Sequence, residues 1–88
     1  MQILFSDNGR EDYRHWMVAD SKTLLRLNGL IEECRRTPFR GTGKPEPLKG
    51  DLQGWWSRRI THDDRLVYRV RGQGAEQVLE IAQCRFHY

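Results

Sequence analysis

Four ionisable side chains of this 88-residue sequence have the types and surroundings that phosphodiester chemistry needs. Glu46 stands between two prolines in the run KPEP, and proline restricts the directions in which this carboxylate can point. Arg59 and Arg65 stand in the runs WSRR and RLVY, and His87 is the penultimate residue. A histidine side chain exchanges protons near neutral pH. The set therefore contains a possible base, a possible acid and two cations.

These residue types match the cleavage of RNA by its own 2′-hydroxyl group. The reaction needs a base for the 2′-hydroxyl proton, an acid for the departing 5′-oxygen and cations for the growing negative charge. Glu46 and His87 suit the base and the acid, and Arg65 and Arg59 suit the phosphate. No metal ion or other cofactor is required, and DNA should resist this route because it lacks the 2′-hydroxyl. Taken singly, each group has a simpler explanation: a surface counter-charge for a nearby lysine, ordinary surface arginines, and an incidental histidine.

The basic residues are concentrated in the middle of the chain. The formal net charge is +3, but residues 35–71 carry +6, against −2 before them and −1 after them. Trp55, Trp56 and Tyr68 are interleaved with these cations, a combination typical of phosphate contacts with base stacking. We therefore expect nucleic-acid binding, with Trp55 as a substrate-binding residue. The alternative is a well-solvated surface on which arginines extend their charged ends into water.

Two amphipathic helices are predicted for the first half of the chain. Their apolar residues recur at spacings of three and four, with Tyr13, Trp16 and Met17 in the first helix and Leu24, Leu27, Ile31 and Cys34 in the second. Asp7 or Asn8 would cap the first helix, and Asp20 and Ser21 would end it and cap the second. Pro38 would end the second, because the residue before a proline is disfavoured in helical geometry.

Strands are predicted on both sides of the helices. Residues 2–6 form a short apolar run, expected to be buried on at least one face, and residues 55–60, 65–70 and 77–86 are strand-like. Residues 38–50 contain three prolines and three glycines and are predicted as a loop. The result is one α+β domain over residues 1–88, of order β-α-α-β-β-β. We expect an antiparallel sheet of about four to five strands with a two-helix hairpin packed on one face.

Side-chain alternation decides which arginines can share a face of the sheet. Arg58 and Arg59 leave opposite faces of their strand, so one of them is expected on the ligand face. In the next strand, Leu66, Tyr68 and Val70 are expected to face the core, and Arg65, Val67 and Arg69 to look outward. Arg59 and Arg65 can share a face only if the hairpin loop has an odd number of residues, in the absence of a bulge.

The remaining features point to a reduced, non-membrane protein. Cys34 and Cys84 do not make a disulfide framework, and no CxxC or HxxxH spacing gathers zinc ligands. His15 and His62 are expected at the surface. No apolar run approaches the roughly 20 residues that span a bilayer, and the N-terminus lacks a secretory pattern. We therefore expect a cytoplasmic protein.

Five stretches of the sequence together resemble the YoeB toxins, the Txe/YoeB branch of the RelE superfamily of bacterial toxin–antitoxin systems. The stretches are RRTPF (35–39), GKPEPLK (43–49), WSRRI (56–60), RLVYRV (65–70) and CRFHY (84–88). The resemblance implies a RelE-like, microbial-RNase-like fold and a ribosome-dependent mRNA endonuclease that cuts the codon in the ribosomal A site and inhibits translation. It implies Glu46 as general base, Arg65 as the transition-state cation and His87 as general acid. Lys49, Arg59 and Tyr88 would bind or orient the substrate.

The resemblance also implies partners. These are the ribosome and mRNA, a YefM/Phd-type antitoxin, operator DNA through the antitoxin complex, and a second copy of the chain in a homodimer. Two other functions stay open at this point. One is a non-catalytic RNA- or ribosome-binding module that uses the same basic and aromatic surface, and the other is a co-repressor acting with its antitoxin.

Overall fold

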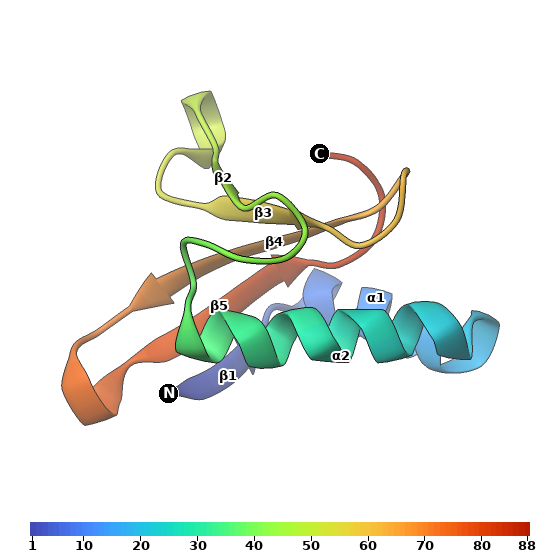
Figure 1. Ribbon diagram of the computed structural model, residues 1–88, viewed down its shortest axis with the longest axis horizontal. Helices are drawn as coiled ribbons and strands as arrows, with labels where there is room; N and C mark the ends of the chain where they lie inside the picture. Colours follow the sequence, from blue (N-terminus) through green and yellow to red (C-terminus); the bar gives the residue numbers. More distant parts are fainter.

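Two helices pack on one face of a five-stranded sheet in the computed structural model, which describes residues 1–88 (Figure 1). The strand order across the sheet is β1-β5-β4-β3-β2. The elements are β1 (Gln2–Phe5), α1 (Asp7–Ala19), α2 (Ser21–Arg36), β2 (Glu46–Pro47), β3 (Trp56–Arg59), β4 (Arg65–Arg71) and β5 (Val78–Gln83), with short 3₁₀ turns at Gly50–Leu52 and Gly74–Glu76. The predicted α+β class, with its order β-α-α-β-β-β and a helical hairpin on one face, is confirmed.

The helices begin and end at polar caps. The Ser6 side chain accepts a hydrogen bond from the backbone N–H of Gly9, so Ser6, and not Asp7 or Asn8, caps α1. Asp20 ends α1 and caps α2 through the backbone N–H of Thr23, as predicted. The Thr23 hydroxyl also donates to this carboxylate, and this bond lowers the pKa of Asp20.

The core lies between the helices and the sheet. Its helical members include Trp16, Leu27, Leu30, Ile31 and Cys34, and its sheet members include Ile60, Leu66, Tyr68, Leu79 and Ile81. The predicted apolar face of α2 is confirmed. On α1 the prediction for Met17 is wrong: this residue is 60% exposed, while its neighbour Trp16 is buried in the core. Neither helix is long and apolar enough to cross a membrane.

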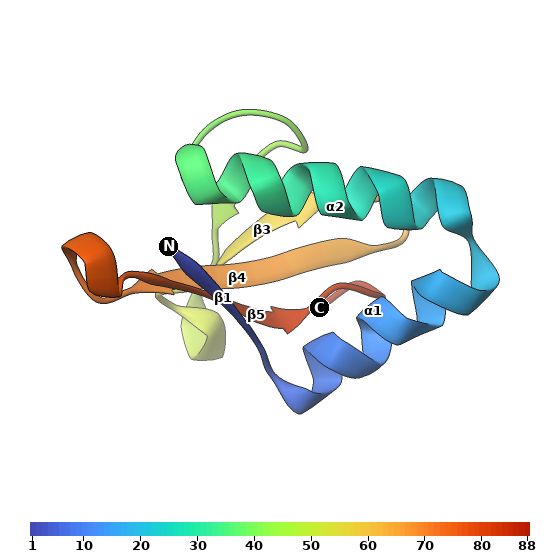
Figure 2. The same cartoon turned by 90° about the horizontal axis from the view of Figure 1, so that it is seen from below.

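The sheet is mixed, whereas a wholly antiparallel one was expected. β1 pairs in parallel with β5, while the other neighbours are antiparallel. Short turns force antiparallel pairing only between strands that they join, and β1 meets the last strand of the chain. β1 is also an edge strand with Ile3 and Leu4 largely exposed, so the expected burial of residues 2–6 is wrong for these two residues. Figure 2, seen from the helix side, shows α1 lying beside the end of β5.

The face of the sheet opposite the helices is the one that carries the site. Arg59 is exposed on this face, while Arg58 points into the protein and is fully buried. Val67 and Arg65 were expected to look outward, but on this second face they are buried, with 1% and 9% of their surface exposed. The end of the chain folds back over it, and the Tyr88 hydroxyl lies 3.2 Å from Oγ of Ser57, the residue opposite Val67 in β3. Figure 1 shows the C-terminus on the side of the sheet away from the helices.

Candidate active site

A cavity of about 230 Å³ on the open face of the sheet collects most of the predicted site residues. Its walls come from β2, β3, β4 and the end of the chain, segments that are far apart in the sequence. The lining residues are Lys44, Glu46, Ser57, Arg59, Arg65, His87 and Tyr88. The predicted base, acid and transition-state cation therefore share one cavity with two of the four predicted substrate-binding residues.

Glu46 is held by a short strand within the segment predicted as a loop. β2 contains only Glu46 and Pro47, and Glu46 lies opposite Ser57 of β3. The loop before it is fixed by the backbone N–H of Arg59, which donates to the Gly43 carbonyl at 2.7 Å. Gly43 has φ +86°, and a Cβ there would lie 3.1 Å from the Arg59 carbonyl oxygen, so glycine allows this close approach.

The Glu46 carboxylate is free of protein partners. The four ion pairs of the structure lie elsewhere, and no side-chain hydrogen bond involves Glu46. It is therefore not a counter-charge paired with a lysine, the simpler explanation that the sequence allowed. An unpaired, exposed carboxylate in a cavity with three cationic side chains can accept a proton from a bound substrate.

Arg59 and Arg65 lie directly opposite each other in the antiparallel pair of β3 and β4. The loop between them spans residues 60–64, an odd number, so the condition for a shared face is met. One nitrogen of Arg65, Nη1, donates to the carbonyls of Thr61, His62 and Asp64 at 2.9 to 3.1 Å. These bonds fix the guanidinium plane and leave its Nε and Nη2 without a protein partner. Two guanidinium groups on the same side of the cavity can donate charge-assisted hydrogen bonds to a phosphate group.

His87 and Tyr88 complete the cavity from the end of the chain. Their rings lie 5.1 Å apart, and Nδ1 of His87 is 3.4 Å from the Tyr88 carbonyl oxygen. The Tyr88 hydroxyl contacts the buried Ser57, while His87 and Tyr88 themselves remain exposed. The imidazole and the Glu46 carboxylate line the same space, as acid–base cleavage of a phosphodiester requires.

Two predicted substrate-binding residues lie outside the cavity. Lys49 is exposed just before the turn Gly50–Leu52. Trp55 stacks under Arg69, whose guanidinium carbon is 4.3 Å from the ring centre and whose Nε pairs with Glu80. By alternation Trp55 shares the face of Ser57 and Arg59, so it extends the open face beyond the cavity. The roles of Lys49 and Trp55 stay predictions.

Lys44 and Ser57 line the cavity and were not predicted as site residues. Both had a signal in the sequence. Lys44 immediately precedes the PEP run that holds Glu46, and Ser57 stands two residues before Arg59, which places it on the same face of the strand. Lys44 has φ +53°, a backbone conformation that the pattern of residues does not reveal.

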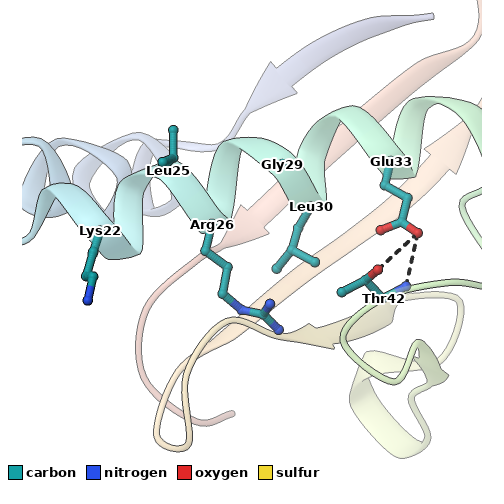
Figure 3. Close-up of a pocket in the computed structure, with 7 residues that line it drawn as sticks. All are labelled: Lys22, Leu25, Arg26, Gly29, Leu30, Glu33 and Thr42. Atoms are coloured by element: carbon teal, nitrogen blue, oxygen red, sulfur yellow. Dashed lines mark hydrogen bonds between the residues drawn. The ribbon is translucent and has the colours of Figure 1, made fainter.

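A larger hollow of about 470 Å³ lies along α2, but two of its charged side chains, Glu33 and Arg26, are already bound to other protein groups (Figure 3). Its carboxylate, Glu33, accepts hydrogen bonds from the backbone N–H and hydroxyl of Thr42, and the backbone bond is the main reason that the pKa of Glu33 is lowered. Arg26 donates to the carbonyls of Ile60 and Arg59 at 2.6 and 3.0 Å. Glu33 thus holds α2 against the loop that precedes β2, and Arg26 holds α2 against the end of β3.

The two cysteines contribute no nucleophile to either hollow. Both are buried free thiols. Burial raises the pKa of Cys34 to about 11 and that of Cys84 to about 12. Because the thiolate is the reactive form, neither sulfur is a nucleophile at neutral pH.

The sheet, the helical hairpin and the chain order are those of the RelE-like toxins. A family model described as "YoeB-like toxin of bacterial type II toxin-antitoxin system" matches residues 5–88. The chain belongs to this YoeB family of type II toxin–antitoxin systems.

Individual relatives agree over the whole length. Toxin YoeB of Streptomyces coelicolor is 51% identical over 88 residues, all of both chains. Among solved structures, a YoeB/ParE toxin from Agrobacterium tumefaciens is 52% identical over the full length of both chains, with a TM-score of 0.97. Two structures from Staphylococcus aureus are each 39% identical and cover all of this chain and 98% of theirs: a YoeB dimer, with a TM-score of 0.88, and a heterotetrameric YoeB–YefM toxin–antitoxin complex, with a TM-score of 0.86.

Proposed function

We propose that this toxin is an endoribonuclease that cleaves mRNA in the ribosomal A site by metal-independent acid–base catalysis and so inhibits translation. The observation that supports the proposal most is the single cavity that joins Glu46, His87, Arg59 and Arg65. A carboxylate without a protein partner, an imidazole and two guanidinium groups are the components that cleavage by the 2′-hydroxyl requires.

Each residue has a defined step in this reaction. Glu46 removes the proton of the 2′-hydroxyl, and the resulting oxygen attacks the adjacent phosphorus. Arg65, assisted by Arg59, stabilises the negative charge that develops on the phosphate oxygens. His87 donates its proton to the departing 5′-oxygen as the P–O bond breaks. The products are a 2′,3′-cyclic phosphate, which water can open to a 3′-phosphate, and a 5′-hydroxyl.

Dependence on the ribosome follows from how little the protein encloses its substrate. Glu46, Arg59, His87 and Tyr88 are all exposed, so the cavity alone holds a flexible RNA strand poorly. Acid–base groups contribute factors of about 10² to 10⁴ each, and orienting the reactants contributes about 7–11 kcal/mol more. A ribosome that holds the codon in place would supply much of this orientation. Lys49 and Trp55, beyond the cavity on an accessible surface, would then contact RNA.

The partners proposed for the protein follow the same family. A YefM-type antitoxin is proposed because the S. aureus relative forms a YoeB–YefM complex, and a homodimer because a YoeB dimer is known from the same species. Operator DNA would be bound through the antitoxin complex. A cytoplasmic location is part of the proposal, because ribosomes, mRNA and such an antitoxin would be met there.

The decisive experiment is primer extension on an mRNA bound to purified ribosomes. We expect new 5′ ends inside the A-site codon with the unchanged protein, and their formation slowed by about 10²- to 10⁴-fold with Glu46→Ala and with His87→Gln, while co-sedimentation with ribosomes persists. His62→Gln is the matched control, because His62 is exposed in the β3–β4 turn and outside the cavity. If translation arrest survives equally in Glu46→Ala and His87→Gln, the protein acts by occupancy, as a non-catalytic binding module.

A further inference from the structure

The last residues of the chain are held at two points by backbone hydrogen bonds. At the first, the backbone N–H of Cys84 donates to Oδ2 of Asp12 at 3.1 Å, and the Cys84 carbonyl accepts from Nε1 of Trp16 at 2.7 Å. At the second, the backbone N–H of Phe86 donates to Oδ1 of Asp64 at 2.7 Å, and its carbonyl accepts from the backbone N–H of Arg65 at 3.0 Å. The second point lies next to His87 in the chain.

Asp64 is itself oriented for this contact. Its other oxygen, Oδ2, accepts a hydrogen bond from the Thr61 hydroxyl at 2.7 Å. The same hydroxyl oxygen accepts from the backbone N–H of Asp64 at 3.1 Å. One carboxylate oxygen is thus fixed within the turn, which leaves the second aimed at the end of the chain. Asp64 also directly precedes Arg65, so a single turn connects the phosphate-binding cation to the segment that carries the acid.

Phe86 depends on these bonds because little else holds it in place. Its φ is +66°, a conformation that a bulky residue rarely adopts and that persists only when surrounding contacts impose it. Its ring is 59% exposed and lies against the guanidinium group of Arg85, outside the core. Without the bond to Asp64, only the bond between the Phe86 carbonyl and the Arg65 N–H opposes relaxation of residue 86 to negative φ, a rotation that would redirect every atom that follows.

We propose that Asp64 is a positioning residue for His87, which holds the backbone of Phe86 so that the imidazole stays in the cavity beside Arg65. The inference rests on the proposed nuclease function. The Asp64 carbonyl also accepts a hydrogen bond from Nη1 of Arg65, but this backbone contact survives substitution of the side chain. The carboxylate itself acts through the end of the chain. Its loss should therefore lower the cleavage rate constant while ribosome affinity stays unchanged.

Single-turnover cleavage of ribosome-bound mRNA tests this with three variants. Asp64→Ala is expected to lower the rate constant about 10- to 100-fold, the effect of losing a hydrogen bond to a charged group. Asp64→Asn keeps an acceptor oxygen and is expected to lose less than about threefold. Asp63→Ala is the matched control, because this neighbouring carboxylate is exposed and its side chain makes no hydrogen bond; it should retain full activity. Full activity of Asp64→Ala would overturn the proposal.

The double variant Asp64→Ala/His87→Gln separates positioning from other roles. If Asp64 acts through His87, the double variant cleaves no more slowly than His87→Gln alone. A further loss by the same 10- to 100-fold factor would place the effect of Asp64 elsewhere and overturn the proposal.

Amide hydrogen exchange provides a readout that does not depend on cleavage. The Phe86 amide should be protected in the unchanged protein and in Asp63→Ala, and should lose protection in Asp64→Ala while core amides keep theirs. Retained protection at Phe86 would contradict the proposal whatever the activity. Full cleavage by His87→Gln would instead refute the nuclease mechanism, and the exchange result would still decide whether Asp64 holds the end of the chain.

Discussion

Replacing Arg58 tests how much one buried side chain contributes to the stability of the fold that carries the site. Its side chain is fully buried, pairs with Glu33 at 3.3 Å and donates to the hydroxyl of Tyr68 at 3.1 Å. It also donates to three backbone carbonyls of the segment that leads to β2, those of Thr37, Arg40 and Thr42. One guanidinium group therefore ties α2, β4 and this loop together, and Arg58→Met would remove every donor while nearly preserving volume.

The expected loss is a large fraction of the total stability. Removing one partner of a buried ion pair costs about 3–5 kcal/mol, because the groups left behind stay desolvated. A domain of this length has about 4–13 kcal/mol of unfolding free energy in all. Each kcal/mol shifts Tm by about 4–8 °C at this size, so Arg58→Met should melt at least about 12 °C below the unchanged protein.

Urea titration followed by tryptophan fluorescence would measure this loss, because Trp16 is buried in the core and reports on unfolding. Arg35→Met is the matched control. Arg35 pairs with Glu32 at 3.0 Å, but both side chains are substantially exposed, so the change should stay within about 0.5 kcal/mol. A loss below about 1 kcal/mol in Arg58→Met would refute the reasoning, since it would mean that water replaces the guanidinium at the loop carbonyls.

Three further predictions concern other parts of the fold. Burial raises the pKa of Asp12, so ionisation of this carboxyl destabilises the folded protein; the cost is absent below the unfolded-state pKa near 3.8 and grows as the pH rises above it. Asp12→Asn avoids this cost, so its unfolding free energy should increase relative to that of the unchanged protein between about pH 3 and about pH 7 in urea titrations. Gly29→Ala, with open space at its Cβ on α2, should stabilise by about 0.5–1 kcal/mol, whereas Gly9→Ala, whose Cβ would lie 2.7 Å from a carbonyl oxygen of β5, should destabilise by about 1–3 kcal/mol in thermal melts. Cys34 and Cys84 should resist a thiol-specific reagent in the folded protein and react fully in urea, because burial keeps their pKa values at about 11 and about 12; fast labelling of the folded form would contradict this.

Features that depend on neighbours along the chain could be predicted from the sequence. The apolar spacing of α2 and its end before Pro38 were of this kind, because helical periodicity and proline sterics act over a few residues. The shared face of Arg59 and Arg65 also followed from the sequence, because the length of a hairpin loop and the two-residue period of a strand set it together.

Other features were decided only by the tertiary structure. Whether Arg58 or Arg59 turns inward depends on which face the helices cover, and the parallel pairing of β1 depends on the order of the strands. The approach of His87 to Glu46 depends on a strand order that places β2 and β5 on either side of β3 and β4, and on the bonds that Asp12 and Asp64 make to the last residues. Periodicity describes one element at a time. Distances between elements follow from how the whole chain buries its apolar surface and pairs its backbone, and no local pattern contains that information.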